Sequence, residues 1–80
     1  MPMFYFDIRE DDAFFEDEEG SDHRDVDSAQ REAAEVAAAI GRERFPERGA
    51  GSVIIEVRNE DRQRVLTATV TLHVDRLGSH

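Results

Sequence analysis

The segment "RVLTATVTLHV", residues 64–74, constrains the fold most strongly because apolar and polar residues alternate along it. One face carries Leu66, Ala68, Val70, Leu72 and Val74, and the other carries Val65, Thr67, Thr69, Thr71 and His73. Alternation with a period of two predicts a half-buried β-strand. Such a strand requires other strands beside it and a cover for its apolar face.

Three further segments are predicted to supply those strands. "MFYFDIR" alternates strictly, with Phe4, Phe6 and Ile8 on one face. "FFED" is predicted to be a short second strand that completes a hairpin over residues 3–18. "VIIEVR" is predicted to pair with the last strand in a second hairpin over residues 52–74.

Between the hairpins the apolar period becomes helical. The apolar residues of one predicted helix face are Val26, Ala29, Ala33, Val36, Ala37 and Ile40. Asp25 is the preferred N-cap, and Asp27 is the competing candidate. Gly41 ends the helix, or the helix continues to Phe45, because Pro46 disfavours further extension. The predicted helix covers residues 25–45.

These elements predict a single α+β domain over residues 1–80 with the order ββαββ. Its two layers are a four-stranded, mainly antiparallel sheet and one amphipathic helix that covers one face of the sheet. Residues 75–80 form a tail that is expected to fray. The order of the strands in the sheet does not follow from the pattern.

Acidic residues are concentrated in the first third of the chain. Residues 1–27 contain 11 acids and two arginines, a net charge of −9, whereas residues 28–80 contain 8 acids and 8 arginines. This charge disfavours direct binding to nucleic acid or to anionic membranes, and it favours a basic protein partner. Acidity that merely keeps the protein soluble is the alternative interpretation.

The stretch "FFEDEEGSD" contains the acidic patch Glu16, Asp17, Glu18, Glu19 and Asp22. Aligning Gly20 with the glycine of a calcium loop places Phe15 and Val26 at ligand positions, so the calcium-loop motif fails. We therefore predict no metal site. Asp22 leads into the N-terminus of the predicted helix, whose dipole favours negative charge, and residues 16–19 are interpreted as a solvated edge that discourages strand aggregation.

The composition argues against most catalytic chemistry. The chain has neither Cys nor Lys, which excludes thiolate and Schiff-base chemistry. His23 is flanked by acids and is expected to be exposed, and the sequence has no nucleophile-elbow motif. No catalytic or cofactor-binding residue is predicted, and we expect the protein not to be an enzyme.

Adjacent Phe14 and Phe15 point to opposite faces of a strand, so one of them must leave the helix-covered core. This predicts an interface on the outer face of the sheet, formed by Tyr5, Phe14, Phe15, Ile54, Val65, Thr67, Thr69 and Thr71. A Thr-rich face exposed to water is the alternative. We expect a homodimer that forms through this face or through the edge of the long last strand.

Four features in this order resemble a known family: "YFDIR", "DEEG", an Ala/Arg/Glu-rich helix, and "IEVRNED" with a final strand. The family consists of small bacterial proteins, largely from alphaproteobacteria, and is catalogued as a domain of unknown function. The similarity covers roughly residues 3–72. Family members usually have a Gly in the last hairpin turn, where Asn59 or Asp61 can take the left-handed conformation instead. The resemblance implies no activity or cofactor.

The resulting hypothesis is a small, acidic, non-enzymatic protein-interaction module that self-associates. The alternative is an acidic inhibitor or antitoxin-like protein that covers a basic surface of a protein partner. With no apolar run resembling a signal peptide or a membrane span, a cytoplasmic location is expected.

Overall fold

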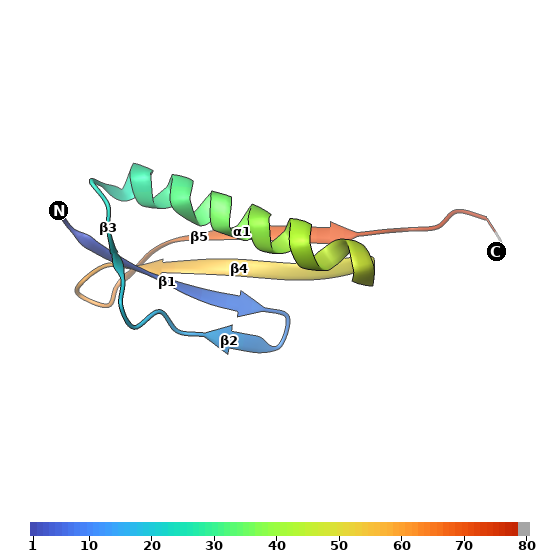
Figure 1. The fold of residues 1–80 in the computed structure, drawn as a ribbon, viewed down its shortest axis with the longest axis horizontal. Coiled ribbons are helices and arrows are strands. Elements are labelled where there is room, and N and C mark those ends of the chain that lie inside the picture. The colour runs from blue at the N-terminus through green and yellow to red at the C-terminus, as the bar shows by residue number, and fades with distance from the viewer. Residues whose placement is uncertain (79–80) are drawn as a thin grey trace.

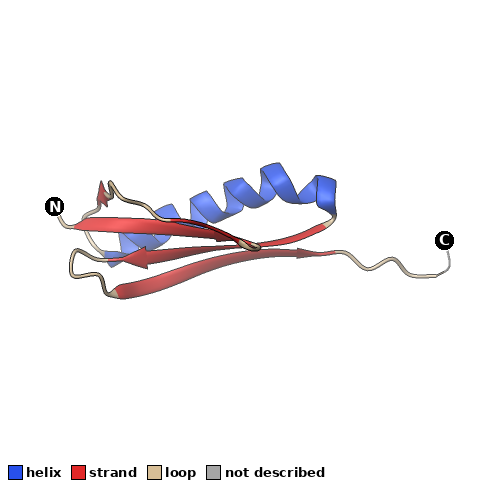
Figure 2. Ribbon diagram, turned by 90° about the horizontal axis from the view of Figure 1, so that it is seen from below, coloured by secondary structure: helices blue, strands red, loops and turns tan. Residues whose placement is uncertain are grey.

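The computed structural model describes residues 1–78 and shows an α+β fold in which one helix packs on an antiparallel sheet (Figure 1). The elements follow one another as β1 (Met3–Glu10), β2 (Ala13–Phe15), β3 (Ser21–Asp22), α1 (Val26–Arg48), β4 (Ala50–Arg58) and β5 (Arg64–His73). The sheet therefore has the four expected strands and the additional two-residue β3. Figure 2 shows the helix along one side of the strands.

The strand order is β2-β1-β4-β5, with β3 paired to β1, and all pairs are antiparallel. The first hairpin and the second are thus joined through β1 and β4. In that pair Ile8 lies opposite Ile55, and Asp7 lies opposite Glu56. Because directly opposed residues share a face, the first pair lies on the helix side and the second on the outer side.

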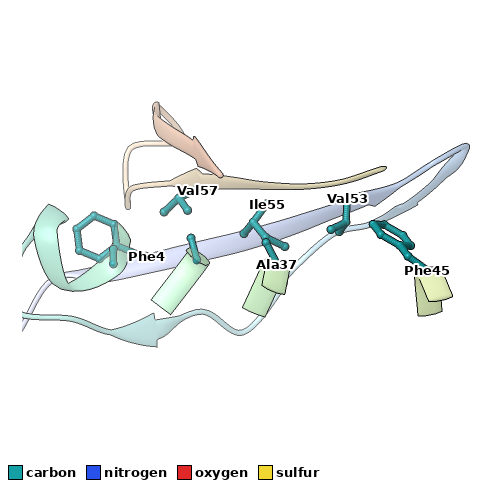
Figure 3. Packing of buried hydrophobic residues seen from close by; sticks show 8 residues of the cluster. Phe4, Ala37, Phe45, Val53, Ile55 and Val57 are labelled. Atoms are coloured by element: carbon teal, nitrogen blue, oxygen red, sulfur yellow. The ribbon is translucent and has the colours of Figure 1, made fainter. Parts of the chain in front are cut away.

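The core is a single row of side chains between α1 and the sheet. The buried residues are Phe4, Ala29, Ala33, Ala37, Phe45, Val53, Ile55 and Val57. Figure 3 shows the labelled members of this row from Phe4 at one end to Phe45 at the other. The alanines let α1 lie close to the sheet. At Gly51 a Cβ would lie 2.5 Å from the Phe45 ring, so glycine is required where that ring packs on β4.

Asp25 caps α1 as expected, because its Oδ1 accepts a hydrogen bond of 2.9 Å from the Ser28 amide. The helix does not stop at Phe45: it includes Pro46 and ends at Arg48, with Gly49 as the C-cap. Burial of Phe45 and an ion pair of 2.8 Å between Arg48 and Asp11 hold this last turn against the sheet. These tertiary contacts offset the backbone hydrogen bond that proline cannot donate.

The turn between β4 and β5 differs from the expectation. Arg62, rather than Asn59 or Asp61, has the left-handed conformation, with φ of 64°. The Asn59 side chain instead accepts hydrogen bonds from the amides of Asp61 and Gln63. The register also shifts between Val57 and Arg58, so Val65 is an extra residue in the ladder.

Residues 74–78 have no regular secondary structure and continue beyond the end of β5 (Figure 1). Residues 79–80 of the expected tail lie outside the described residues. Within the described part of the chain, no helix combines the length and the apolar character needed to cross a membrane.

Candidate functional site

The outer face of the sheet is charged rather than apolar. Asp7 and Glu56 lie opposite each other on β1 and β4, and they are only 5% and 8% exposed although the helix is on the other face. Arginine side chains cover them: Arg58 pairs with Asp7, while Arg9 and Arg64 both pair with Glu56. The face is therefore a ladder of alternating carboxylates and guanidinium groups.

The shortest ion pair on this face, between Arg58 and Asp7, belongs to a group that we call the motif cluster. This cluster consists of Tyr5, Asp7, Asp17, Gly20 and Arg58. The Arg58 guanidinium donates to both carboxylate oxygens of Asp7, at 2.6 and 3.1 Å, and to the Asp17 carbonyl at 3.0 Å. Its Cζ also lies 4.9 Å from the centroid of the Tyr5 ring. The cluster joins "YFDIR", "DEEG" and "IEVRNED" in one place, although these segments are far apart in the sequence.

Hydrogen bonding keeps both carboxylates of the motif cluster ionised. Burial of Asp7 pushes its pKa up, but donors on Arg58 and the Asp17 amide outweigh burial, so the pKa lies below its usual value. Burial also raises the pKa of Asp17, but the amides of Phe6, Gly20 and Glu19 donate to it and lower that pKa overall. The hydrogen bond to Asp7 in turn raises the pKa of Arg58.

Gly20 fits the motif cluster for two reasons. Its φ of 73° lies in the left-handed region that glycine adopts without steric cost. A Cβ at this position would also lie 2.7 Å from the Tyr5 ring. The loop can therefore approach β1 closely enough for Asp17 to reach the β1 backbone.

Asp17 closes the outer edge of β1. Near one end of β1, Phe4 pairs with Ser21 of β3, and toward the other end Ile8 pairs with Phe15 of β2. Between them the Phe6 amide donates to Asp17 Oδ2 at 3.0 Å. Phe4, Phe6 and Ile8 follow one another at intervals of two residues. At this interval the backbone N–H and C=O groups of an antiparallel strand point toward the same edge. The Asp17 carboxylate thus accepts the hydrogen bond that a strand continuing between β2 and β3 would accept.

The opposite edge of the sheet has no comparable closure. β5 is ten residues long, and among residues 1–78 its single sheet partner is β4. From Val65 to Leu72 it carries no charged residue and no proline. On the helix side, Leu66, Ala68, Val70 and Leu72 are only half-buried. This strand has the properties of an edge that can add another strand.

Beside the motif cluster lies an open depression of about 680 Å³. Tyr5 and Phe14 contribute its aromatic surface, and Arg58 and Arg62 contribute its positive charges. Its carboxylates are Asp7, Glu16, Asp17, Glu18 and Glu60. Five negative and two positive side chains leave a net charge of −3, so the depression favours a positively charged ligand over an anion.

Six of the eight residues predicted to form an apolar interface lie on the outer face, but charged side chains lie among them. Phe14 lies on the outer face opposite Arg9, whose Cζ is 4.7 Å from the ring centroid. Phe15 is on the helix side opposite Ile8, and Val65 packs against the core. Tyr5 lies against Arg58, while Ile54 is opposite Thr69 on the second hairpin. Thr67, Thr69 and Thr71 are exposed along β5, next to Ile54 on the same face.

The residues of the acidic patch differ in exposure. Glu16, Glu18, Glu19 and Asp22 are exposed, but Asp17 is half-buried and holds the loop against β1, so the expectation of a wholly solvated edge is wrong for Asp17. In the described part of the chain, no group of three or more Asp, Glu or His residues is arranged to hold a metal ion.

His23 is half-buried, contrary to the expectation that it is exposed. Its ring lies 5.2 Å from the Phe6 ring and 6.1 Å from the Phe4 ring, between centroids. Its two ring nitrogens lie 3.1 and 3.4 Å from the hydroxyls of Ser21 and Ser28. His23 therefore covers the end of the core where β3 leads into α1.

Sequence reasoning predicted an apolar interface on the outer face and did not recognise the motif cluster. A signal was present, because Glu56 and Arg58 interrupt the otherwise apolar segment "VIIEVR" and need partners if they are buried. Choosing those partners requires the order of the strands, which the alternating pattern does not contain.

Comparison with protein families matches the chain to the model described as "Domain of unknown function (DUF6894)", which covers residues 3–71. This range includes every element of the sheet except the last two residues of β5, and it includes the whole motif cluster. Searches of curated proteins and of solved structures gave no significant match.

Proposed function

We propose that this chain, which belongs to the DUF6894 family, is a non-enzymatic protein-interaction module that associates with a second copy of itself. The observation that carries the proposal is the incomplete cover of its apolar residues. Among residues 1–78, eight hydrophobic residues are buried, but nine others that pack against them are only partly buried. In a domain of 80 residues the core is small, so covering this second group stabilises the fold.

The charge arrangement also supports a binding role over catalysis. The two buried carboxylates, Asp7 and Glu56, are paired with arginines that hold neighbouring segments together. Lowered rather than raised carboxylate pKa values, such as those of Asp7 and Asp17, suit stable ion pairs better than general acid catalysis near neutral pH. These groups therefore fit a structural role.

The oligomeric state tests the proposal directly. Light scattering coupled to size-exclusion chromatography should give a dimer at micromolar concentrations, and the dimer should persist in 1 M salt because buried apolar area drives it. A monomer at several hundred micromolar would overturn the proposal.

A second candidate function rests on the acidic depression beside the motif cluster. Its net charge of −3 suits a basic protein surface, as in an inhibitor that covers such a surface. Calorimetric titration with an arginine-rich peptide tests this. Binding should weaken strongly between 0.05 and 0.5 M salt, because the Debye length shortens over that range. Salt-independent binding or no binding would count against it.

A further inference from the structure

We infer that the self-association takes place at one particular edge: β5 pairs in antiparallel fashion with β5 of a second copy. The two sheets then form one sheet that runs from β2 of one copy to β2 of the other. This inference rests on the proposed self-association and adds its surface and geometry.

The first argument is the difference between the two edges of the sheet. The β1 side is closed by two short strands and by Asp17, which accepts the Phe6 amide between them. β5 offers ten residues of backbone with a partner on one side only among the described residues. Its exposed side chains over the middle are threonines. An uncharged, regular edge of this length is suited to pairing with another strand.

The second argument is the position of α1. It packs to a similar extent on β4 and β5, which places it over the line between these two strands. With strands about 4.8 Å apart, the helices of two copies joined at β5 would be about 10 Å apart. Packed helices are typically separated by 8–10 Å. The two helices can thus pack together above the new strand pair.

The third argument is the composition of the helix side that would meet its equivalent. Val36, Ile40 and Arg44 form one stripe at intervals of four residues, and Arg44 pairs with Glu10 of β1 at 3.3 Å. That stripe therefore borders β1. Ala34 and Ala38 lie on the opposite side of the helix and are exposed. Their small side chains permit close approach of a second helix above β5.

The fourth argument is electrostatic. Each copy carries a net charge of −9, and all of this excess lies in residues 1–27, which form β1 to β3. Joining the copies at β5 leaves the two acidic regions on opposite sides of the extended sheet, beyond the Debye length of about 8–10 Å. Joining them at β2 would place the acidic patches together. Antiparallel pairing at β5 also brings Arg64 of one copy toward Asp75 at the other end of its partner's strand.

Disulfide trapping tests the geometry cleanly because the chain contains no cysteine. We would prepare Thr67→Cys, Thr69→Cys and Thr71→Cys on β5, with Phe14→Cys on β2 as the control at the closed edge. Opposed residues in antiparallel strands have Cα atoms about 4.5–5.5 Å apart, which a disulfide can bridge. At least one β5 variant, or a mixture of two, should cross-link about tenfold faster than Phe14→Cys. Faster cross-linking of Phe14→Cys would overturn the inference.

A charge substitution provides a second readout. Thr69→Glu places like charges near one another across the proposed strand pair, and we expect the dimer dissociation constant to rise at least about tenfold. Ala39→Glu adds the same charge on an exposed part of α1 and should leave it unchanged. A dimer unaffected by Thr69→Glu would refute the β5 interface while leaving self-association intact. A monomeric wild-type protein would instead refute the proposed function itself.

Discussion

The two edges of the sheet differ in how their backbone hydrogen-bonding groups are covered. On the β1 side, backbone groups are covered by β2, by β3 and, between them, by the Asp17 carboxylate. On the β5 side, ten regular residues have a partner on one side only within the described chain. Because unpaired strand edges readily recruit another strand, the closed edge favours solubility and the open edge favours association.

The same comparison explains where the charges lie. At the closed edge Arg58 pairs with Asp7 and donates to the Asp17 carbonyl, and exposed carboxylates surround this contact. The open edge has no charged residue from Val65 to Leu72. Charge repulsion therefore opposes strand addition at the closed edge, and no like charge opposes it along residues 65–72 of β5.

Acidification is expected to destabilise the closed edge more than any single substitution. The pKa values of Asp7 and Asp17 are lower in the folded chain than in the unfolded chain. Their stabilisation is fully present above the unfolded value of about 3.9 and is lost as the pH falls through the folded-state values. Urea unfolding between pH 7 and pH 2.5 measures this loss. The decline should be smaller in Asp17→Asn, and an identical decline would contradict the assignment.

The next largest effect is expected from Arg58→Met. It leaves the carboxylate of Asp7, a residue that is only 5% exposed, without its positively charged partner. We expect a loss of about 3 kcal/mol in the free energy of unfolding, measured in urea. Arg64→Met is the matched control, because Arg64 pairs with Glu56 on the same face but is 61% exposed. That variant should lose less than about 1 kcal/mol. Equal losses would show that the motif cluster is not special.

Asp17→Ala should weaken the closed edge more selectively. It removes the acceptor for the amides of Phe6, Glu19 and Gly20, and we expect a loss of about 2 kcal/mol. Hydrogen exchange of the Phe6 amide should accelerate in this variant. Glu18→Ala changes the neighbouring exposed carboxylate and should have an effect within about 0.5 kcal/mol. Unchanged protection of Phe6 would show that Asp17 does not close the β1 edge.

The smallest effect is expected at the turn that leads into the open edge. Arg62→Gly relieves a left-handed residue with φ of 64° and should raise stability by up to about 1 kcal/mol. Glu60→Gly, in the same turn but without a positive φ, should lower the melting temperature. Neither change should alter the oligomeric state. A lower melting temperature for Arg62→Gly would show that the Arg62 side chain contributes more than its conformation costs.

Periodicity in the sequence was sufficient to predict the α+β fold, the two hairpins around one helix and the Asp25 cap. Each of these depends on residues within a few positions of one another. Alternation in "MFYFDIR" placed Phe6 and Ile8 toward the core, and the helical spacing of Ala29, Ala33 and Ala37 identified the buried face of α1. Local patterns were less reliable at Pro46, where contacts of Phe45 and Arg48 with the sheet extend the helix.

The candidate site was predicted only in part. The threonines of β5 were placed on the outer face, and the edge of this strand was one of the two surfaces expected to form the homodimer. The outer face was predicted to be apolar because Tyr5 and Ile54 were considered without their neighbours. The structure places Asp7 and Glu56 between them and covers both with arginines.

The sequence by itself determined which residues face the core, because alternation and helical spacing act along the chain. Only the tertiary structure decided which edge is closed and which is open. Asp7 and Arg58 are 51 positions apart, and they meet only because β1 and β4 are neighbours in the order β2-β1-β4-β5. Strand order depends on pairing between distant segments, and a pattern of local periods contains no information about that pairing.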